Sequence, residues 1–501
     1  MTDELNDETG VLSETTSEDG GSTSYDSPMA EHLRVAIATD WAPAPPMPHP
    51  ARSDGAPHAA RRRENLSGHF PGQLVVVPGG NLAVRANDTD YAFRAASSFT
   101  WLTGETTADA VLVMTPTASG HDSTLYLREF AQPGEVAYFT SRTYGAVWVG
   151  NVPNLGDTAR VLALTTRPLG ALPNDLAPYR DAEAAALTGF DASVDALLPR
   201  STGERLGQVL DELRLVKDEW ELARLQYACD ATARGFADVA RELPTVLGRT
   251  DIRGERWLEG TFRRRARLEG NEVGYGSIVA AGAHGTTLHW WRNHGTIEPG
   301  QLLLADMGVE TDELYTADVT RTMPVSGEWT PDQLRVYRAV HEAQVAGIAE
   351  VKAGADFLAA HHAAMWVLAD HLHSWGILPV TADVSCAEDP KQPGAGLHRR
   401  YTLHGTSHML GIDVHDCSLA RNEVYRDGTL AVGHVLTVEP GLYFQDNDLS
   451  VPTELRGLGV RIEDDIAVTD GQPINLSAAL PRDPDEVTAW MREVQGTPAA
   501  P

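Results

Sequence analysis

Ionisable side chains end or interrupt the most apolar segments in the C-terminal half of this 501-residue chain. Five of them stand at spaced positions: Asp306, Asp318, His408, Glu439 and Glu463. Because a buried carboxylate without a counter-charge is costly, a fold that buries these segments together must also neutralise these groups. Four carboxylates and one imidazole can do this by holding two divalent cations close together.

The first two aspartates flank a predicted turn. Asp306 follows the apolar run 302–305, which is typical of a buried strand, and residues 315–322 alternate as a second strand does. If the two strands form a hairpin, Asp306 and Asp318 face each other across it. The alternative is two unrelated surface aspartates.

Three histidines lie close together in the segment HGTSHMLGIDVHD, at His404, His408 and His415. Gly405 and Gly411 argue against a regular helix here, so we expect a glycine-rich loop that brings imidazoles to a cavity. A single histidine is usually structural, whereas three beside other candidate ligands indicate a site.

The last two carboxylates follow apolar runs near the C-terminus. Glu439 ends the run 435–438, where a strand end presents a ligand easily. Arg461 and Glu463 alternate with aliphatic residues, so both point to one face of a strand. Arg461 is then able to orient Glu463 as a ligand. The alternative for this pair is a salt bridge on a solvated face.

Composition limits the class of partner. The formal charge of -30 argues against nucleic acid or an anionic membrane as the main partner. Three scattered cysteines fit a reducing cytosol rather than a disulfide framework, which predicts a cytoplasmic protein. No apolar run approaches the length of a membrane span, and we expect no secretory signal.

We predict three segments along the chain. Residues 1–58 are an acidic disordered tail followed by a proline-rich extended arm from Trp41 to His58. Residues 59–210 form an N-terminal α/β domain, and residues 211–495 form a second domain that carries the five candidate ligands. The strands predicted in the N-terminal domain are QLVVVPG, AVLVMTP, GAVWVG and ARVLALT.

Helices are predicted mainly in the C-terminal half. One begins near Lys217 and closes at Pro244, and a second runs from Thr250 to Gly270. A third begins at Thr330, where TPDQ provides an N-cap, a proline at the first helical position and a capping box. The two tryptophans after His289 are expected to be core aromatics.

The motifs LHWWRNHGTIEPGQLLLADMGVE, YTADVTRTMPVSG, LHGTSHMLGIDVHD, VLTVEPGLYF and GVRIEDDIAVT resemble those of the M24 metallopeptidases. Within that family the chain is most similar to the aminopeptidase P group. The segments NDTDYAFRAASSFTWLTG and KDEWELARL also match its pattern. The resemblance implies an α+β protein in which an N-terminal α/β domain precedes a catalytic domain of the pita-bread fold.

The resemblance also implies a ligand set. Asp306 and Asp318 would bind one cation, His408 and Glu439 would bind the other, and Asp318 and Glu463 would bridge them. The two divalent metals of the family are usually manganese, and a hydroxide between them would be the nucleophile. The loop before Asp318 is one residue longer than is common, and Ser407 replaces a frequent glycine, but neither change removes a ligand.

The remaining matched positions have substrate-side roles. Glu439 would move the proton, His289 and His415 would hold the substrate carbonyl, and His404 would line the pocket for the leaving proline. Arg461 matches the arginine beside the last ligand. The implied substrates are peptides with proline in second position, and the implied assembly is a homodimer or homotetramer.

Two other functions share much of this pattern. Prolidase, which cleaves Xaa-Pro dipeptides, has the same five ligands, so the ligand set does not separate it from an aminopeptidase. A pita-bread domain that only binds partners usually loses ligands, whereas all five are present here. Creatinase-like hydrolases lack the metal carboxylates, and methionine aminopeptidases generally lack the N-terminal domain.

Overall fold

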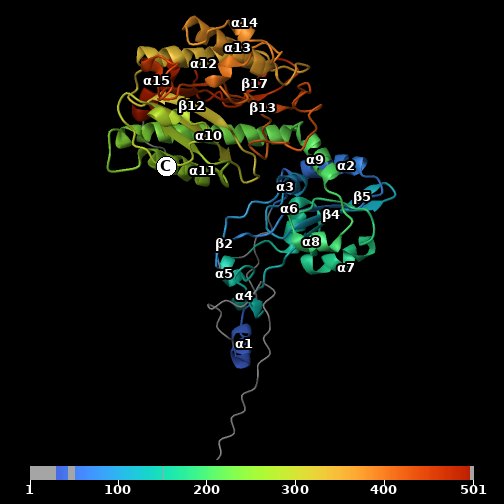
Figure 1. The fold of residues 1–501 in the computed structure, drawn as a ribbon. Coiled ribbons are helices and arrows are strands. Elements are labelled where there is room, and N and C mark those ends of the chain that lie inside the picture. Colours follow the sequence, from blue (N-terminus) through green and yellow to red (C-terminus); the bar gives the residue numbers. More distant parts are fainter. Residues whose placement is uncertain (1–29, 43–50, 88, 151, 497–501) are drawn as a thin grey trace, which may run out of the picture.

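The computed structural model describes residues 30–42, 51–87, 89–150 and 152–496. The acidic tail predicted for residues 1–28, and residues 43–50 of the predicted arm, lie outside these ranges. Figure 1 shows a smaller N-terminal part in blue to green and a larger part in green to red. Within the described ranges, no helix is both long and apolar enough to cross a membrane.

The N-terminal part is built around one mixed sheet with the strand order β6-β5-β4-β1-β7. β1 pairs antiparallel with β4 and parallel with β7. The strands are β1 Val75–Pro78, β2 Val84–Ala86, β3 Thr89–Asp90, β4 Val111–Thr117, β5 Gly120–Leu127, β6 Thr165–Pro168 and β7 Ala185–Ala186. The helices are α1 Glu31–Ala38, α2 Ala56–His69, α3 Ser97–Thr103, α4 Ala137–Thr140, α5 Ala146–Val149, α6 Leu155–Leu162, α7 Leu172–Leu176, α8 Ala192–Leu197 and α9 Glu204–Arg214, with 3-10 turns η1 Leu169–Ala171 and η2 Ala177–Tyr179.

Two of the four predicted strands of this part are wrong. GAVWVG forms the helical turn α5, and most of ARVLALT belongs to helix α6, with β6 beginning at Thr165. Asn154 caps α6 by accepting the backbone N–H of Asp157, a signal that favours the helix. A short apolar run alone does not separate helix from strand. The predicted extended arm also ends early, because α2 begins at Ala56.

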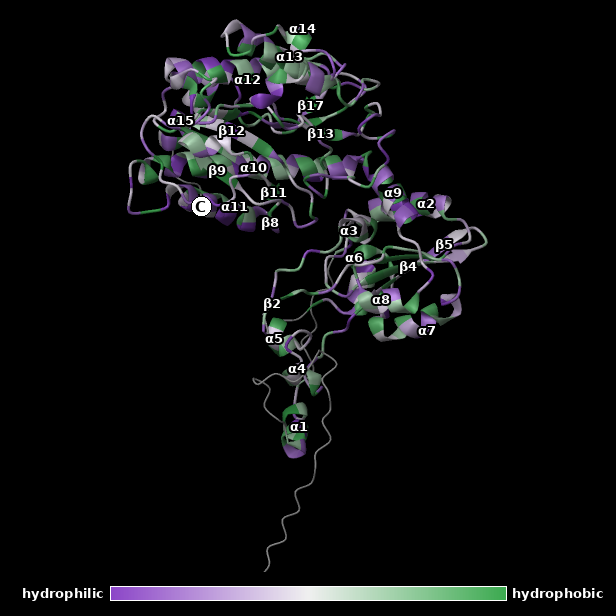
Figure 2. Cartoon of the chain, in the orientation of Figure 1, coloured by the Kyte–Doolittle hydropathy of each residue, from purple (hydrophilic) through white to green (hydrophobic). Residues whose placement is uncertain are grey.

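The larger part surrounds its strands with long helices. In Figure 1 strands β12, β13 and β17 lie between α12 and α13 on one side and α10 on the other. Figure 2 shows hydrophilic and hydrophobic stretches alternating along α10 and α12, as amphipathic helices require. The helices are α10 Glu219–Val246, α11 Gly254–Glu269, α12 Pro331–Ala349, α13 Ala359–Ser374, α14 Ala382–Ser385 and α15 Pro484–Gly496, with 3-10 turns η3 Gly282–Thr286, η4 Leu397–Arg400 and η5 Thr453–Leu455.

The strands of this part form several small sheets. The orders are β12-β10-β9, β13-β16-β17, β14-β15 and β11-β8. Their bounds are β8 Glu272–Val273, β9 Ile278–Ala281, β10 Leu302–Met307, β11 Val309–Glu310, β12 Val319–Pro324, β13 Val435–Val438, β14 Gly441–Tyr443, β15 Gly459–Arg461, β16 Asp464–Ala467 and β17 Ile474–Asn475.

Helix starts in this part follow their sequence signals. α10 and α12 each begin with a complete capping box, at Asp218 and at Thr330. The predicted start at Thr330 is confirmed. α10 continues to Val246 rather than closing at Pro244, which lies in its last turn. α11 falls within the predicted helical range from Thr250 to Gly270.

The hairpin predicted around Asp306 is confirmed. β10 and β12 pair antiparallel, with Asp306 opposite Thr320, and every residue of both strands is buried. Gly308 lets the two segments of the hairpin approach each other closely just past the strand ends, because a Cβ there would lie 1.8 Å from the Ala317 carbonyl oxygen. Since side chains alternate, Asp318 falls on the same face as Thr320 and Asp306.

Candidate metal centre

Separate elements carry the five candidate ligands to one place. Asp306 lies near the end of β10, Asp318 directly precedes β12, Glu439 directly follows β13, and Glu463 lies between β15 and β16. His408 lies in an irregular loop, as expected, and this loop runs beside β13. The Thr437 N–H donates to the His408 carbonyl, and the Glu439 N–H donates to the Thr406 carbonyl.

Four of the five side chains form a tight group. His408 Nε2 lies 3.4 Å from Asp318 Oδ2 and 3.3 Å from Glu439 Oε1. Asp318, His408 and Glu463 each offer one ligand atom, and these atoms lie within 4.8 Å of one another. The candidate ligands therefore converge, and the alternative of unrelated surface aspartates is wrong.

Asp306 is held by two donors, the half-buried Tyr275 and the buried Arg461. The Tyr275 hydroxyl donates to its Oδ1 at 2.6 Å, and Arg461 Nη2 donates to its Oδ2 at 2.6 Å. Arg461 was expected to orient Glu463, but in the structure its guanidinium bonds to Asp306 instead. Glu463 accepts a hydrogen bond from the Thr320 hydroxyl at 2.6 Å. Arg461 is buried, so a salt bridge on a solvated face is also wrong.

Two of the predicted substrate-side histidines, His404 and His415, lie against this group. His404 Nε2 lies 2.8 Å from the Tyr443 hydroxyl, and His404 Nδ1 lies 3.5 Å from Glu439 Oε2. The His415 ring lies 4.3 Å from that of His408, measured between centroids. Both His415 and His289 are exposed, so they are open to a ligand.

The tryptophans beside His289 are not both core residues. Trp291 is 61% exposed and stacks on His289 with a centroid distance of 5.1 Å and an interplanar angle of 7°. Trp290 is half-buried, and its indole N–H donates to Glu255 at 2.9 Å. The expectation of core aromatics is therefore wrong for Trp291, which forms an exposed apolar face beside a candidate site residue.

Crowded carboxylates dominate the electrostatics. Burial, together with the charges of Asp306 and Glu439, raises the pKa of Asp318 to about 6 even though His408 opposes the shift. Burial holds the pKa of Glu463 well above its usual range, and the charges of Asp318, Glu439 and Asp306 add to this shift. These carboxylates therefore carry an excess of negative charge, which a bound cation would neutralise.

His408 supplies part of that charge when no cation is bound. Burial lowers its pKa, but hydrogen bonds with Asp318 and Glu439 outweigh this and hold the pKa well above the usual value. Burial raises the pKa of Glu439, but the hydrogen bond with His408 and the charge of His404 lower it to about 2. A cation bound by these oxygens would release the imidazole to act as a neutral ligand.

The donor set fits divalent cations. Carboxylate oxygens with one imidazole suit manganese and similar metals rather than soft ones. Three of the four ligating carboxylates have a second partner that orients them: Asp306 accepts from Tyr275 and Arg461, Glu439 from Thr437, and Glu463 from Thr320. Asp318 is held through its backbone, because its N–H donates to Asp465 at 3.0 Å. Metal ligands in proteins are commonly oriented by such partners.

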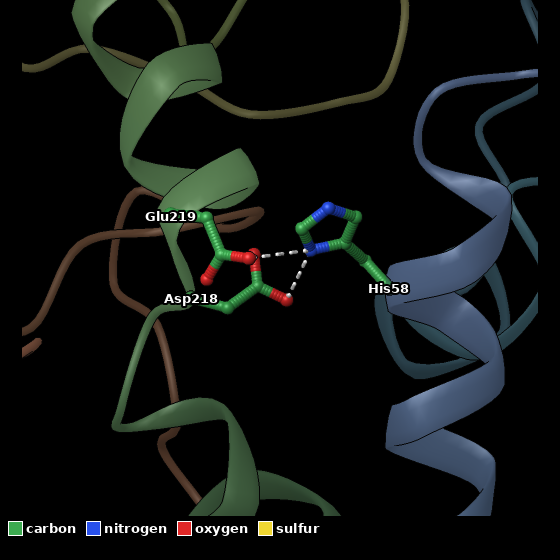
Figure 3. Close-up of side chains that lie close together, drawn as sticks. All are labelled: His58, Asp218 and Glu219. Carbon is green, nitrogen blue, oxygen red and sulfur yellow. Dashed lines mark ion pairs between the residues drawn. The ribbon is translucent and has the colours of Figure 1, made fainter.

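A second group of possible ligands lies elsewhere, where the two parts of the chain meet. His58 Nδ1 is 3.1 Å from Asp218 Oδ2 and 3.9 Å from Glu219 Oε1 (Figure 3). Both carboxylates already have arginine partners, since Arg62 pairs with Asp218 and Arg61 pairs with Glu219, each at 2.9 Å. Asp218 also caps α10, so this group joins the two parts.

Four residues around the centre were not predicted from the sequence. Tyr275 donates to Asp306, and Tyr443 contacts His404. Asp465 accepts the Asp318 N–H. The fourth is Thr320, which the sequence could have indicated. It lies two residues after Asp318 on an alternating strand, so its side chain must lie on the same face as that of Asp318. The other three contacts depend on how separate segments pack.

Comparison with known proteins agrees with this architecture. Residues 223–470 match the model of metallopeptidase family M24, and residues 59–184 match that of the aminopeptidase P N-terminal domain. The chain is 49% identical over 453 residues to Xaa-Pro aminopeptidase 1 of Streptomyces coelicolor, covering 88% of each chain. It is 29% identical to the Xaa-Pro aminopeptidase of Escherichia coli, covering 86% of this chain and 96% of that one.

Solved structures give the same result. The structure of aminopeptidase P from Escherichia coli with the inhibitor Pro-Leu superposes with a TM-score of 0.77 at 27% identity, covering 89% of this chain and all of that one. The fold and the two matched domains define a metal-dependent hydrolase. The chain belongs to metallopeptidase family M24, within the aminopeptidase P group. The predicted α+β class, with an N-terminal α/β domain before a pita-bread domain, is confirmed.

Proposed function

We propose that the protein releases the N-terminal residue from peptides with proline in second position. The observation that carries the proposal is the convergence of the buried Asp318 and Glu463 with the half-buried His408 and Glu439 in a chain of this family. Relatives at 49% and 48% identity are named Xaa-Pro aminopeptidases, which supports the same substrate class.

We propose that the site holds two divalent cations and that both are manganese. The residues that would hold them are Asp306, Asp318, His408, Glu439 and Glu463. Bound cations of this kind supply a hydroxide nucleophile at neutral pH and polarise the scissile carbonyl. Tyr275 and Arg461 keep Asp306 oriented, and Thr320 keeps Glu463 oriented. This chain's own contribution is therefore a rigid, pre-oriented set of oxygen donors.

Glu439 is the group best placed to move a proton. In the metal-free protein its carboxylate is ionised at neutral pH, because His408 and His404 lower its pKa to about 2, and a bound cation would also favour the ionised form. It can accept a proton at a carboxylate oxygen from the attacking water and deliver it to the departing proline nitrogen. Thr437 Oγ1 donates to Glu439 Oε1 at 3.3 Å and so restrains the carboxylate.

Three histidines are proposed to act on the substrate. His289 and His415 are exposed beside the group and would donate hydrogen bonds to the substrate carbonyl and to the oxyanion that develops there. His404 and Tyr443 would form a wall of the pocket for the leaving proline. Proline after the scissile bond offers no N–H, so shape rather than a hydrogen-bond acceptor selects it.

The closest alternative is a prolidase that accepts only dipeptides. The direct test is hydrolysis of an Xaa-Pro-Xaa tripeptide and an Xaa-Pro dipeptide by metal-stripped protein, with and without added Mn²⁺, beside Asp318→Ala. Manganese-dependent release from the tripeptide, absent in the variant, is the expected result. Cleavage of the dipeptide alone would mean prolidase, and no cleavage of either would favour a binding scaffold.

We also propose that the protein acts in the cytosol as a homodimer or homotetramer. Cys229, Cys386 and Cys417 are free thiols, which suits a reducing compartment. Light scattering of the full chain tests the assembly, and a monomer at all concentrations would contradict it. Fractionation of the producing cells tests the compartment.

A further inference from the structure

One arginine of the N-terminal part reaches the loops that carry the candidate ligands. Arg94 lies just before α3. Its Nε donates to Glu310 Oε2 at 2.7 Å, and its Nη2 donates to the carbonyl oxygen of Ile412 at 2.8 Å. The same Nη2 lies 3.3 Å from Asp413 Oδ1. A single planar guanidinium therefore bonds to two segments that are about a hundred residues apart in the chain.

The first segment is the turn that joins Asp306 to Asp318. Glu310 ends β11 inside this turn and is 3% exposed. Its second carboxylate oxygen accepts a hydrogen bond from Asn271 at 2.7 Å, and its backbone bridges to Thr316. The position of Glu310 thus sets the path of the chain between the two aspartates.

The second segment is the histidine loop. Ile412 and Asp413 stand between His408 and His415, and the Ser97 hydroxyl of α3 donates to Asp413 Oδ1 at 2.6 Å. The two segments also bond to each other, since the Thr316 N–H donates to the carbonyl oxygen of Gly411 at 3.0 Å. Arg94 therefore binds beside the point where the ligand-bearing loops meet.

We propose that Arg94 is a positioning residue for the metal centre, through which the N-terminal part holds the Asp306–Asp318 turn and the histidine loop in register. This inference rests on the proposed function for its effect on turnover, but not for its effect on loop order or metal binding. The N-terminal part then contributes directly to the geometry of the catalytic centre.

The charge balance supports this role. Glu310 is almost completely buried. Without the Arg94 guanidinium beside it, the Glu310 carboxylate would have to move toward water or take up a proton. Either change shifts the turn that ends at Asp318. The Arg94 side chain is 36% exposed, so the guanidinium is restrained by its partners rather than by packing, and a small guanidinium compound can reach the same position.

Two variants and a matched control test the proposal. Arg94→Ala removes the contacts, and Arg94→Lys keeps the charge but not the planar pair of donors. Arg61→Ala is the control, because Arg61 also joins the two parts, through Glu219 at 2.9 Å, yet contacts neither loop. Each protein is prepared as the full chain and stripped of metal.

Amide hydrogen exchange of the metal-free proteins is the first readout. Exchange in residues 308–318 and 408–416 should become faster in Arg94→Ala and not in Arg61→Ala. The second readout is calorimetric titration with Mn²⁺, where the dissociation constant of Arg94→Ala should rise by about 10-fold, in the range for residues that orient ligands. Arg94→Lys should fall between the wild type and Arg94→Ala.

Chemical rescue separates positioning from a general loss of folding. Added ethylguanidinium should restore part of the Mn²⁺ affinity and turnover of Arg94→Ala and should not affect Arg61→Ala. Unchanged exchange and Mn²⁺ affinity in Arg94→Ala would overturn the proposal, and so would an equal loss in Arg61→Ala. If no Xaa-Pro peptide is cleaved, the proposed function fails, but exchange and Mn²⁺ binding still decide the role of Arg94.

Discussion

Arg461 and Asp306 are 155 positions apart, yet Nη2 of the arginine lies 2.6 Å from Oδ2 of the aspartate. The same guanidinium donates to the Thr320 and Tyr443 hydroxyls at 3.0 Å each. Through these bonds Arg461 contacts the side of the hairpin that carries Asp306 and the wall beside His404. Arg461 therefore joins β10, β12 and β14 around the centre.

Replacing Arg461 with Met should destabilise the metal-free protein strongly. The change leaves Asp306 buried without its cationic partner, and breaking a buried pair in this way costs about 3 kcal/mol or more. Urea unfolding of the metal-stripped protein measures the loss. Excess Mn²⁺ should recover much of it, because a bound cation neutralises the same carboxylate.

The matched control for this change is Arg400→Met. Arg400 pairs with Asp448 at 2.8 Å, but its side chain is 60% exposed, so the midpoint of unfolding should not move measurably. An equal loss in both variants would show that the effect comes from removing an arginine in general. It would then contradict a specific role for the bond to Asp306.

Asp318 should make the metal-free protein less stable as the pH rises from about 4 to about 6. Its pKa is raised from 3.8 to about 6 in the folded state, so the folded protein holds this proton more tightly than the unfolded chain does. The resulting stabilisation is complete below 3.8 and is lost as the pH rises through about 6. Glu463, whose pKa is also raised, acts in the same direction.

Asp318→Asn should therefore reduce the slope of unfolding free energy against pH in this window. The measurement is denaturant unfolding at several pH values after metal removal. Bound Mn²⁺ should reduce the wild-type slope too, because it keeps the carboxylates ionised throughout. A variant with the same slope as the wild type would show that Asp318 does not titrate in this range.

Trp291→Ala should lower turnover while leaving stability nearly unchanged. Trp291 is 61% exposed, so its removal should change the free energy of unfolding by no more than about 0.5 kcal/mol. The stacked ring restrains His289, so kcat should fall as that imidazole gains freedom. Trp291→Phe keeps a ring and should keep most of the activity. Full activity in Trp291→Ala would show that stacking does not position His289.

The sequence predicted the parts of the centre that depend on local pattern. The apolar run that ends at Asp306 and the alternating run 315–322 around Asp318 indicated a hairpin, and the structure pairs Asp306 with Thr320 across it. Period-two alternation placed Arg461 and Glu463 on one face. These signals are local because a strand repeats every two residues whatever surrounds it.

The partners of those side chains could not be predicted in the same way. Arg461 was expected to orient Glu463, its neighbour on the strand, but it bonds to Asp306 because β15 packs beside β10. Trp291 was expected in the core, yet it lies exposed on His289. Which segments meet is decided by packing of the whole domain, and no single segment carries that information.

Thr330→Ala should destabilise the protein without altering the metal centre. Thr330 accepts the Gln333 N–H at 3.2 Å, and Gln333 donates no bond to any candidate ligand. Loss of such a cap costs about 1 kcal/mol. Thermal unfolding measures the loss, and Mn²⁺ titration of the same variant should match the wild type. Weakened Mn²⁺ binding would mean that α12 is coupled to the centre.

Glu463→Gln gives the opposite pattern and completes this comparison. Ligands that bind only the folded state raise the midpoint of thermal unfolding, so Mn²⁺ should stabilise the wild type and Thr330→Ala by similar amounts. Glu463→Gln removes a carboxylate that the crowded group keeps above its usual pKa, so the metal-free variant should be at least as stable as the metal-free wild type. It should gain little from Mn²⁺, because one ligand is missing. Equal stabilisation of all three proteins by Mn²⁺ would contradict the proposed ligand set, since the ion would then be bound elsewhere.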